Sequence, residues 1–254
     1  MNGPALELPL KNRVFQRDKS NTATITFTTD APVKAQILSG KKVVKPWQTT
    51  SGAIPGVPVG GPYTLQIDVR GAIKSVPGLM VGDLWVMAGQ SNMDGTAKLV
   101  DLEAPSRMVH AFYHDDTWAV AKDPLCRVLD SPDPVHWHVP ETELRAAREQ
   151  DRAFREVGGS IGVRFGKEVA KIAGVPVGLL VCSHGGTSME QWDPQKKHLG
   201  GFSLYGSMLR RVQACGGKVA GVIWYQGESD ASPEAAPLYK GRMKALVAEM
   251  RADF

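Results

Sequence analysis

The stretch that decides the fold is residues 84–93, which read LWVMAGQSNM. The run from Leu84 to Ala88 is apolar on both faces of an extended chain, as expected of a strand that helices cover on both sides. Residues 175–182 and 219–225 have the same character. These three runs predict buried strands of a parallel sheet, and therefore an α/β domain that begins at about residue 81.

Apolar residues at helical spacing separate these strands, and each group of them ends at a glycine, which is a common end of a helix. The group before Gly174 consists of Ile161, Phe165, Val169 and Ile172, and the group before Gly216 consists of Leu204, Met208, Leu209, Val212 and Cys215. A strand-helix-strand order implies right-handed crossovers. The carboxyl ends of the strands therefore meet at one edge of the sheet, where open α/β sheets bind their ligands.

The first eighty residues follow a different pattern. Apolar and polar residues alternate over 23–28, 33–37 and 63–69, as they do in half-buried strands. Turns rich in glycine and proline connect these stretches. We therefore predict a small β-sandwich domain over residues 1–80, followed by the α/β domain over residues 81–254.

The composition excludes several classes of protein. With 254 residues, of which 43% are apolar and 22% charged, the chain resembles a globular protein. No apolar run is long enough to span a bilayer, and we expect neither a membrane partner nor a secretory signal, which leaves the compartment open. The net charge of +4 comes from scattered bases, so we expect no nucleic-acid partner. The 3 cysteines form no Cys-x-x-Cys pair, which argues against a disulfide framework or a zinc ribbon. The oligomeric state is left open.

Residues capable of chemistry follow each of the three predicted strands. Ser91 follows the first, where a serine is suited to act as an exposed nucleophile and its own N–H to bind an oxyanion, although a serine here also suits a helix cap. Gly185 and Gly186 follow the second strand and offer either a free amide or a tight turn. Gln226 and Glu228 follow the third. A hydroxyl, a glycine amide and a carboxamide at one edge predict an acyl-transfer site.

Three motifs resemble, in their order, those of the sialate O-acetylesterase family: AGQSNM at 88–93, GGTS at 185–188 with Trp192, and WYQGESD at 224–230. That family belongs to the SGNH-hydrolase superfamily and is close to carbohydrate esterase family 6. The resemblance covers about residues 81–254. It implies a flavodoxin-like three-layer α/β/α domain with a parallel sheet, which removes acetyl groups from sugar hydroxyls with no metal and no cofactor.

The same resemblance implies roles for individual residues. Ser91 would be the nucleophile, and the amides of Ser91 and Gly186 together with the Gln226 side chain would bind the oxyanion. Glu228 would orient a histidine or sustain its loop, and a loop carboxylate that caps backbone amides is an equal alternative. The acetylated carbohydrate is expected to contact Gln90, Asn92, Thr187 and Trp192.

The base that should activate Ser91 is missing from the place where the family carries it. The family has an Asp-x-x-His motif after the third block, whereas no histidine follows His198 here. We expect that the chain stops early, because a further strand should follow its last helix. The substitutes are His136, which ends an Asp133-Pro-Val-His motif in the wrong order, and His184 beside the glycine loop. Without a convincing base, we expect ester hydrolysis that exceeds the rate in water by only about 10³- to 10⁴-fold.

A zinc hydrolase is one alternative function. His110 and His114 are four residues apart with aspartates beside the second, and His136 and His138 form another pair. However, residues 108–114 alternate like a strand, and the sequence has no His-Glu-x-x-His helix.

Two further alternatives keep the α/β scaffold. A non-catalytic carbohydrate-binding protein would stack sugars on Trp192, Trp137 or Tyr205, although buried packing is the ordinary role of such aromatics. A cysteine nucleophile would be Cys182 beside His184, although an isolated cysteine at a strand end is usually a small buried hydrophobe.

Overall fold

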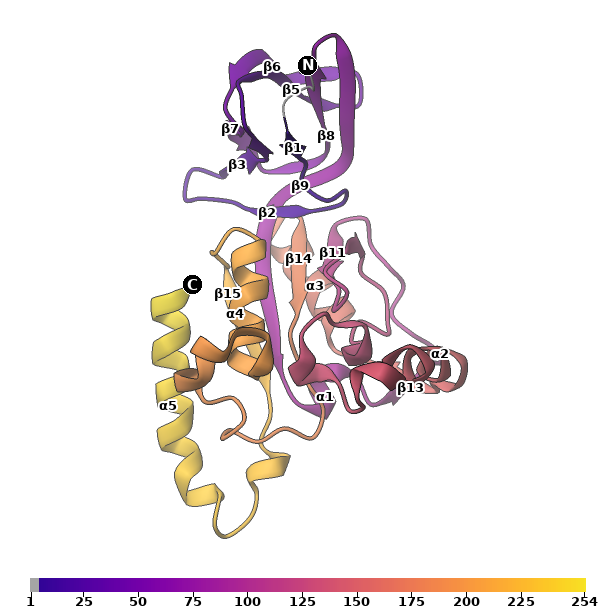
Figure 1. The fold of residues 1–254 in the computed structure, drawn as a ribbon, viewed down its shortest axis with the longest axis vertical. Coiled ribbons are helices and arrows are strands. Elements are labelled where there is room, and N and C mark those ends of the chain that lie inside the picture. Colours follow the sequence, from indigo (N-terminus) through magenta and orange to yellow (C-terminus); the bar gives the residue numbers. More distant parts are fainter. Residues whose placement is uncertain (1–4) are drawn as a thin grey trace.

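One long strand, β9 (Ala72–Gly89), connects the two parts of the molecule in the computed structural model, which describes residues 5–254. In Figure 1 it runs from the β-rich part at the top into the helical part below. Its first half pairs antiparallel with β8 (Gly60–Val69), and its second half pairs in parallel with β14 (Val177–Val181) and β15 (Gly221–Tyr225). The boundary expected between residues 80 and 81 thus falls inside a continuous strand.

The N-terminal strands surround a core of their own. They are β1 (Leu6–Glu7), β2 (Val14–Gln16), β3 (Thr22–Thr26), β4 (Thr28–Thr29), β5 (Val33–Ser39), β6 (Lys42–Thr50) and β7 (Ala53–Pro58). Strands β5 and β6 extend the nine-stranded sheet beyond β8, whereas β3 pairs with β7 and β1 with β4 as separate two-stranded sheets. The expected alternation is confirmed over 23–28, because Ala23, Ile25 and Phe27 are buried and the threonines between them are exposed.

The α/β part contains the predicted parallel strands. From one side to the other, its order is β12 (Trp118–Val120), β11 (Val109–Phe112), β14, β9 and β15, and all are parallel except β12. Strands β10 (Ala97–Lys98) and β13 (Val157–Gly159) form a separate pair beside it. Strands β14 and β15 follow β9 in the chain and lie on opposite sides of it. The strand order therefore reverses at β9, and the carboxyl end of β9 is a switch point of the kind where open α/β sheets bind ligands.

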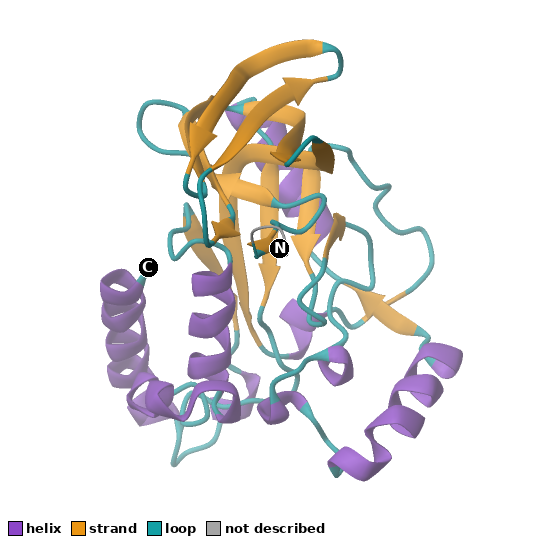
Figure 2. Ribbon diagram, turned by 45° about the horizontal axis from the view of Figure 1, so that its top comes forward, coloured by secondary structure: helices purple, strands orange, loops and turns teal. Residues whose placement is uncertain are grey.

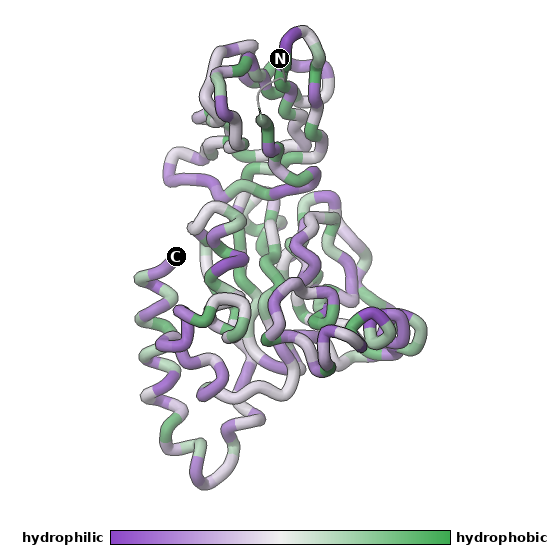
Figure 3. The backbone as a smooth tube through the Cα atoms, viewed as in Figure 1, coloured by the Kyte–Doolittle hydropathy of each residue, from purple (hydrophilic) through white to green (hydrophobic). Residues whose placement is uncertain are grey.

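Helices cover both faces of this sheet (Figure 2). Helix α3 (Gly162–Ala173) lies on one face, and α4 (Leu204–Ala214) and α5 (Ala236–Asp253) lie on the other. Helix α1 (Ser91–Asp94) is a single turn after β9, and α2 (Leu144–Phe154) packs on short 3₁₀ turns. Leu84 and Val86 share a core with residues of α4 and α5, whereas Met87 packs on the α3 side. Successive side chains of β9 point to opposite faces of the sheet and therefore pack into two separate cores. In Figure 3 the hydrophobic colours follow the central strands.

Helix α3 confirms only the middle of the predicted stripe, because Phe165 and Val169 pack against the core but the residues at its two ends do not. Ile161 and Ile172 are 45% and 84% exposed, whereas Gly162, Val163, Gly166 and Ala170 are buried. A Cβ atom on Gly162 would lie 2.5 Å from Leu125, and one on Gly166 would lie 2.5 Å from Val109. The helix packs closely through its glycines, which a hydropathy pattern does not register.

Strand β15 has β9 as its only sheet partner within residues 5–254. A groove of about 440 Å³ lies between β15 and α5, and Val222, Met243 and Phe254 are among the residues that line it. No helix in the described part of the chain is sufficiently long and apolar to cross a membrane.

Candidate active site

The loops that follow β9, β14 and β15 meet at the carboxyl end of β9. Gln90 N–H donates to the Tyr225 carbonyl at 2.9 Å, and His184 N–H donates to the Gly89 carbonyl at 3.0 Å. The loop after β9 is therefore hydrogen-bonded to both of its neighbours. The predicted convergence of three loops at one edge of the sheet is present.

Gly89 lets β9 and β15 approach closely just before Ser91. Its φ is +137°, and a Cβ atom there would lie 2.1 Å from the Tyr225 carbonyl oxygen, so only glycine fits. Ser91 then begins the single turn of α1, and Met93 anchors that turn in the core. Ser91 itself is partly exposed at the edge of the sheet.

The glycine loop after β14 lies against Ser91. A Cβ atom on Gly185 would lie 3.9 Å from both Cα and Cβ of Ser91. The next residue, Gly186, has a φ of +70° and no heavy atom within 4 Å of a Cβ position. Open space therefore adjoins the Gly186 backbone one residue from the Ser91 contact, which suits close approach by a ligand.

Gln226 holds the second and third loops together. Its Nε2 atom donates to the Thr187 carbonyl at 3.0 Å and to Asp230 Oδ2 at 2.5 Å, while its buried Oε1 has no partner. Asp230 is 2% exposed and also accepts from Met189 N–H. Both amide hydrogens of Gln226 are thus in use, and the side chain is available to an oxyanion only when one of these bonds is released.

Three of the four expected substrate contacts are buried parts of the scaffold. Gln90, Thr187 and Trp192 are 3%, 3% and 0% exposed. The Oε1 atom of Gln90 accepts from Ser229 N–H, and Trp192 Nε1 donates to the Thr187 hydroxyl. The Gln90 side chain thus joins the first loop to the third, and the Trp192–Thr187 bond holds the second loop together. Tyr205, an expected stacking residue, is likewise fully buried, and its hydroxyl donates to Asp253.

Asn92 and Glu228 form a polar contact at the surface. The Asn92 amide donates to Glu228 Oε1 at 2.5 Å and accepts from the Thr96 hydroxyl at 3.2 Å. Glu228 lies in the 3₁₀ turn η5 (Glu228–Asp230) and is exposed. This bond joins the third loop to the first.

Asp94 is a residue of this site that the sequence analysis missed. It ends the turn that Ser91 begins, and a Cβ on Gly185 would lie 3.1 Å from its Oδ2. Burial raises the pKa of Asp94 to about 6, although hydrogen bonds from Ser183 and the Gly185 amide oppose the shift. The signal in the sequence is its position three residues after Ser91, because that spacing places both side chains on one face of a helical turn.

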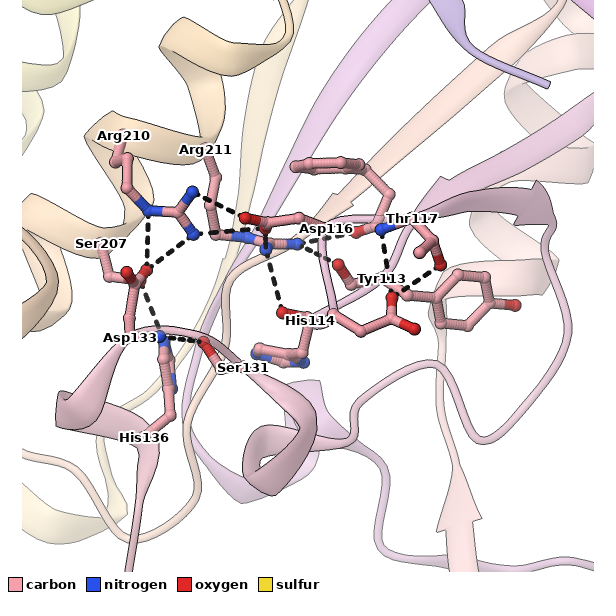
Figure 4. Close-up of polar contacts among 12 residues, drawn as sticks. Tyr113, His114, Asp116, Thr117, Ser131, Asp133, His136, Ser207, Arg210 and Arg211 are labelled. Atoms are coloured by element: carbon pink, nitrogen blue, oxygen red, sulfur yellow. Dashed lines mark hydrogen bonds and ion pairs between the residues drawn. The ribbon is translucent and has the colours of Figure 1, made fainter. Parts of the chain in front are cut away.

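Both histidines considered as a base lie in one hydrogen-bonded chain. His136 Nδ1 lies 3.0 Å from His184 Nδ1, and His136 Nε2 lies 3.1 Å from the Ser207 hydroxyl. That hydroxyl donates to Asp133 Oδ2 at 2.5 Å. The in-chain Asp-x-x-His motif is thus connected to His184 through Ser207 on α4, and Figure 4 shows Asp133, Ser207 and His136 together.

These bonds determine which ring nitrogens carry hydrogen. Because the Ser207 hydroxyl donates to Asp133, it accepts from Nε2–H of His136. His136 Nδ1 is then an acceptor and receives Nδ1–H of His184. A neutral His184 therefore keeps a lone pair on Nε2, which is the form that a general base requires.

The protein environment keeps these histidines neutral. Burial, reinforced by the nearby His138, lowers the pKa of His184 to about 4. Burial also lowers the pKa of His136 and of His114 well below the ordinary range, and neighbouring histidines and Arg211 add to both shifts. The rings are stacked or edge-on with centroids about 5 Å apart, so a second positive charge among them is strongly disfavoured.

Two arginines of α4 hold the chain segments that carry these histidines. Arg210 pairs with both Asp116 and Asp133 (Figure 4). Arg211 has no exposed surface and donates to the Phe112 carbonyl at 2.9 Å, the Tyr113 carbonyl at 2.7 Å and Asp116. The end of β11 and the His136 turn are thereby fixed against α4.

The zinc and cysteine alternatives have no geometric support. Within residues 5–254, no group of three or more His, Cys, Asp or Glu side chains is arranged to hold a metal ion. His110 is hydrogen-bonded to the Asn12 carbonyl at 2.6 Å. Burial raises the pKa of the Cys182 thiol, which lies in the core beneath α4 and is therefore unreactive.

Comparisons with known proteins agree with the motifs. Residues 81–254 match the family model described as carbohydrate esterase, sialic acid-specific acetylesterase. A probable carbohydrate esterase of Arabidopsis thaliana is 26% identical over 180 residues, which cover 67% of this chain and 63% of that protein. Human sialate O-acetylesterase is 24% identical over 197 residues, which cover 69% of this chain and 36% of that protein.

A solved structure has a similar fold. The crystal structure of a carbohydrate acetylesterase from Xanthomonas citri matches with a TM-score of 0.62 at 22% identity, over 98% of this chain and 57% of that chain. The match covers the N-terminal strands as well as the α/β part. In each of these comparisons, the chain spans less than two thirds of its relative's length.

Proposed function

Because the chain belongs to the carbohydrate esterase family of sialic acid-specific acetylesterases, we propose that it hydrolyses acetyl esters of carbohydrates with Ser91 as the nucleophile. The observation that carries this proposal is the position of Ser91 at the switch point of the sheet, with Gly185 packed against it and open space beside Gly186. A serine at such a place is accessible to a substrate, and backbone amides lie next to it.

The proposed reaction has two steps. The Ser91 Oγ atom attacks the acetyl carbonyl carbon while its proton passes to a base, and the N–H groups of Ser91 and Gly186 stabilise the negative oxygen. The bond between the carbonyl carbon and the sugar oxygen then breaks, and that oxygen takes up the proton. In the second step, water attacks acetyl-Ser91, which releases acetate and restores the hydroxyl.

The base in this proposed reaction is His184. The chain from Asp133 through Ser207 and His136 leaves the Nε2 atom of His184 unprotonated, as the aspartate does for the histidine of a serine triad. However, a base with a pKa of about 4 accepts a proton from serine only weakly. We therefore expect turnover below about 1 s⁻¹, the lower end for working enzymes.

The test is acetate release from acetylated oligosaccharides and from an aryl acetate. We expect slow release by the wild-type protein and a loss of at least about tenfold in Ser91→Ala, because the nucleophile and base act as a unit. Ser51→Ala, at an exposed serine between β6 and β7, is the matched control. Release that is equal in Ser91→Ala and Ser51→Ala would overturn the proposal. Sugar binding with no Ser91-dependent release would favour the non-catalytic carbohydrate-binding alternative.

A further inference from the structure

A hollow of about 360 Å³ lies beside Asn92, the residue after Ser91, and near the start of α3. Asn92 and Tyr225, the neighbours in sequence of Ser91 and Gln226, form one wall of it. The other lining residues come mainly from the segments 96–98 and 100–103 and from Ser160 and Ile161 at the start of α3. The hollow therefore adjoins two of the three loops that meet at the carboxyl end of β9.

Tyr225 presents an aromatic side chain to this hollow. It is the last residue of β15, where Trp224 packs in the core toward α4 and α5 and Ile223 packs toward α3. By alternation, Tyr225 faces the same side as Ile223, but beyond the core, and it is 47% exposed. No hydrogen bond to its hydroxyl is present within residues 5–254. Packing within the protein therefore gives no reason for an aromatic ring here.

Other apolar side chains around the hollow are also unusually exposed. Val100, Leu102 and Ile161 are 65%, 37% and 45% exposed, and all three line it together with Tyr225. A contiguous exposed apolar surface with a polar rim is typical of a ligand-binding groove. Ile161, which the sequence pattern assigned to the core, instead belongs to this surface.

The rim supplies hydrogen-bonding groups without an excess of positive charge. Lys98, Thr96 and Ser160 are among its lining residues, and the two hydroxyls, which donate to Asn92 and Asp123, still accept hydrogen bonds. Of the carboxylates present, Glu103 is already paired with Lys167 and Arg164, and Asp123 accepts from Ser160. Burial raises the pKa of Asp123, which further limits its charge. Asp101 also lines the hollow and offsets Lys98, so a carboxylate ligand would find no net attraction.

We propose that this hollow binds an unacetylated, uncharged pyranose unit of the substrate, next to the unit whose acetyl group reaches Ser91, with Tyr225 stacked on the sugar ring. An aromatic ring covers the apolar C–H face of a pyranose, while the polar rim serves its hydroxyl groups. The inference rests on the proposed function for the identity of the neighbouring unit. It specifies an oligosaccharide of neutral sugars as the substrate class.

Titration calorimetry with acetate-free sugars tests this site without any requirement for catalysis. The probes are cellotetraose, xylotetraose, the corresponding monosaccharides and N-acetylneuraminic acid. We expect at least one neutral tetrasaccharide to bind more tightly than its monosaccharide and than N-acetylneuraminic acid. Tyr225→Ala should weaken that binding about three- to tenfold, and Tyr225→Phe should retain it, because the ring and not the hydroxyl makes the contact.

Phe154→Ala is the matched control, because Phe154 is 76% exposed at the end of α2 and does not line the hollow. Tighter binding of N-acetylneuraminic acid would overturn the assignment of a neutral sugar. Equal tetrasaccharide affinities for Tyr225→Ala and Phe154→Ala, or no gain from monosaccharide to tetrasaccharide, would overturn the site. Failure of Ser91-dependent acetate release would refute the proposed function instead, and the two results are measured separately.

Discussion

His136 and His184 face each other through their Nδ1 atoms, 3.0 Å apart, at the end of the sheet that carries Ser91. Only one of the two nitrogens carries the shared hydrogen, so the contact exists only while at least one ring is neutral. Ser207 and Asp133 determine which ring accepts. This relationship connects a motif of the His136 turn to the loop that lies against Ser91.

The first prediction concerns Ser207, which transmits the orientation of Asp133 to His136. Ser207→Ala removes the acceptor for His136 Nε2–H, so His136 and His184 are free to exchange tautomers and Nε2 of His184 becomes protonated part of the time. We expect Ser91-dependent acetate release to fall about tenfold, as when an outer hydrogen-bond partner of a histidine is lost.

The pH profile separates this effect from a structural one. In the wild-type protein, the rate should stay level from pH 8 to about 5 and fall only near pH 4, the pKa of His184. A fall centred near pH 6.5, the ordinary value for histidine, would contradict the assignment of His184. An unchanged rate in Ser207→Ala would show that the hydrogen-bonded chain has no catalytic role.

The second prediction is that acid destabilises the fold before it affects most carboxylates. The pKa values of His114, His136 and His184 are all lowered in the folded protein, so the unfolded chain binds more protons as the pH falls below about 6.5. The stability that these histidines contribute is fully present above that pH and is lost as the pH falls toward 4. Urea unfolding at pH 8, 6 and 5 should show a steadily lower midpoint.

Asp94 acts in the opposite direction, because its pKa is raised in the folded protein and protonation below about pH 6 relieves a buried charge. Burial also raises the pKa of Asp123 and lowers that of His110, so two carboxyls oppose four histidines and the net trend keeps its sign. His198→Gln, at an exposed histidine, is the control that should leave the slope with pH unchanged. A midpoint that rises between pH 8 and pH 5 would contradict this account.

The third prediction concerns Arg211, whose guanidinium lies between α4 and the end of β11. Arg211→Met removes its bonds to the Phe112 and Tyr113 carbonyls and leaves Asp116 with only Arg210. Leaving a buried carbonyl without its donor costs about 1–3 kcal/mol, whereas Asp116 stays paired with Arg210. Urea unfolding should show a loss of this order.

Arg145→Ala provides the comparison for Arg211. Arg145 pairs with Glu149 on the exposed face of α2, with a side chain that is 92% exposed. We expect a change of less than about 0.5 kcal/mol in the free energy of unfolding, as for most surface pairs. Similar losses for the two variants would show that Arg211 does not have a special role in the fold.

The fourth prediction distinguishes two roles of Glu228. Its contact with Asn92 requires an acceptor and no charge. Glu228→Gln keeps an acceptor oxygen, so we expect it to retain acetate release within about twofold, whereas Glu228→Ala should lower it about tenfold by freeing the third loop. A loss in Glu228→Gln as large as that in Glu228→Ala would show that the negative charge is needed, as in a triad.

The parallel strands and the three loops at one edge were predictable, because long apolar runs that end in glycine-rich motifs are local signals. The α3 stripe was half right: Phe165 and Val169 pack against the core, but Gly162 and Gly166 make the closest contacts without any hydropathy signal. The buried state of Trp192 and Thr187 was also missed. Their motif identifies a functional loop, but it does not distinguish residues that build the loop from residues that face the substrate.

The hydrogen-bonded chain could not be derived from the sequence. Its members come from three elements, and the Ser207–Asp133 and His136–His184 pairs are separated by 74 and 48 residues. Such contacts depend on how α4 packs over the sheet, which no local pattern specifies. Asp94 follows the first motif, and Tyr225 lies within the third. What distinguishes them from their neighbours is the burial of Asp94 and the exposure of Tyr225, which depend on the fold.

The most direct test of the central claim is to locate the acetyl group after brief reaction with an aryl acetate. An aryl leaving group needs no proton, so a weak base slows deacetylation more than acetylation and acetyl-enzyme accumulates. Peptide mapping by mass spectrometry should find the acetyl group on Ser91 in the wild-type protein and none on this peptide in Ser91→Ala. Acetylation at other residues only, with acetate release unchanged in Ser91→Ala, would contradict the account.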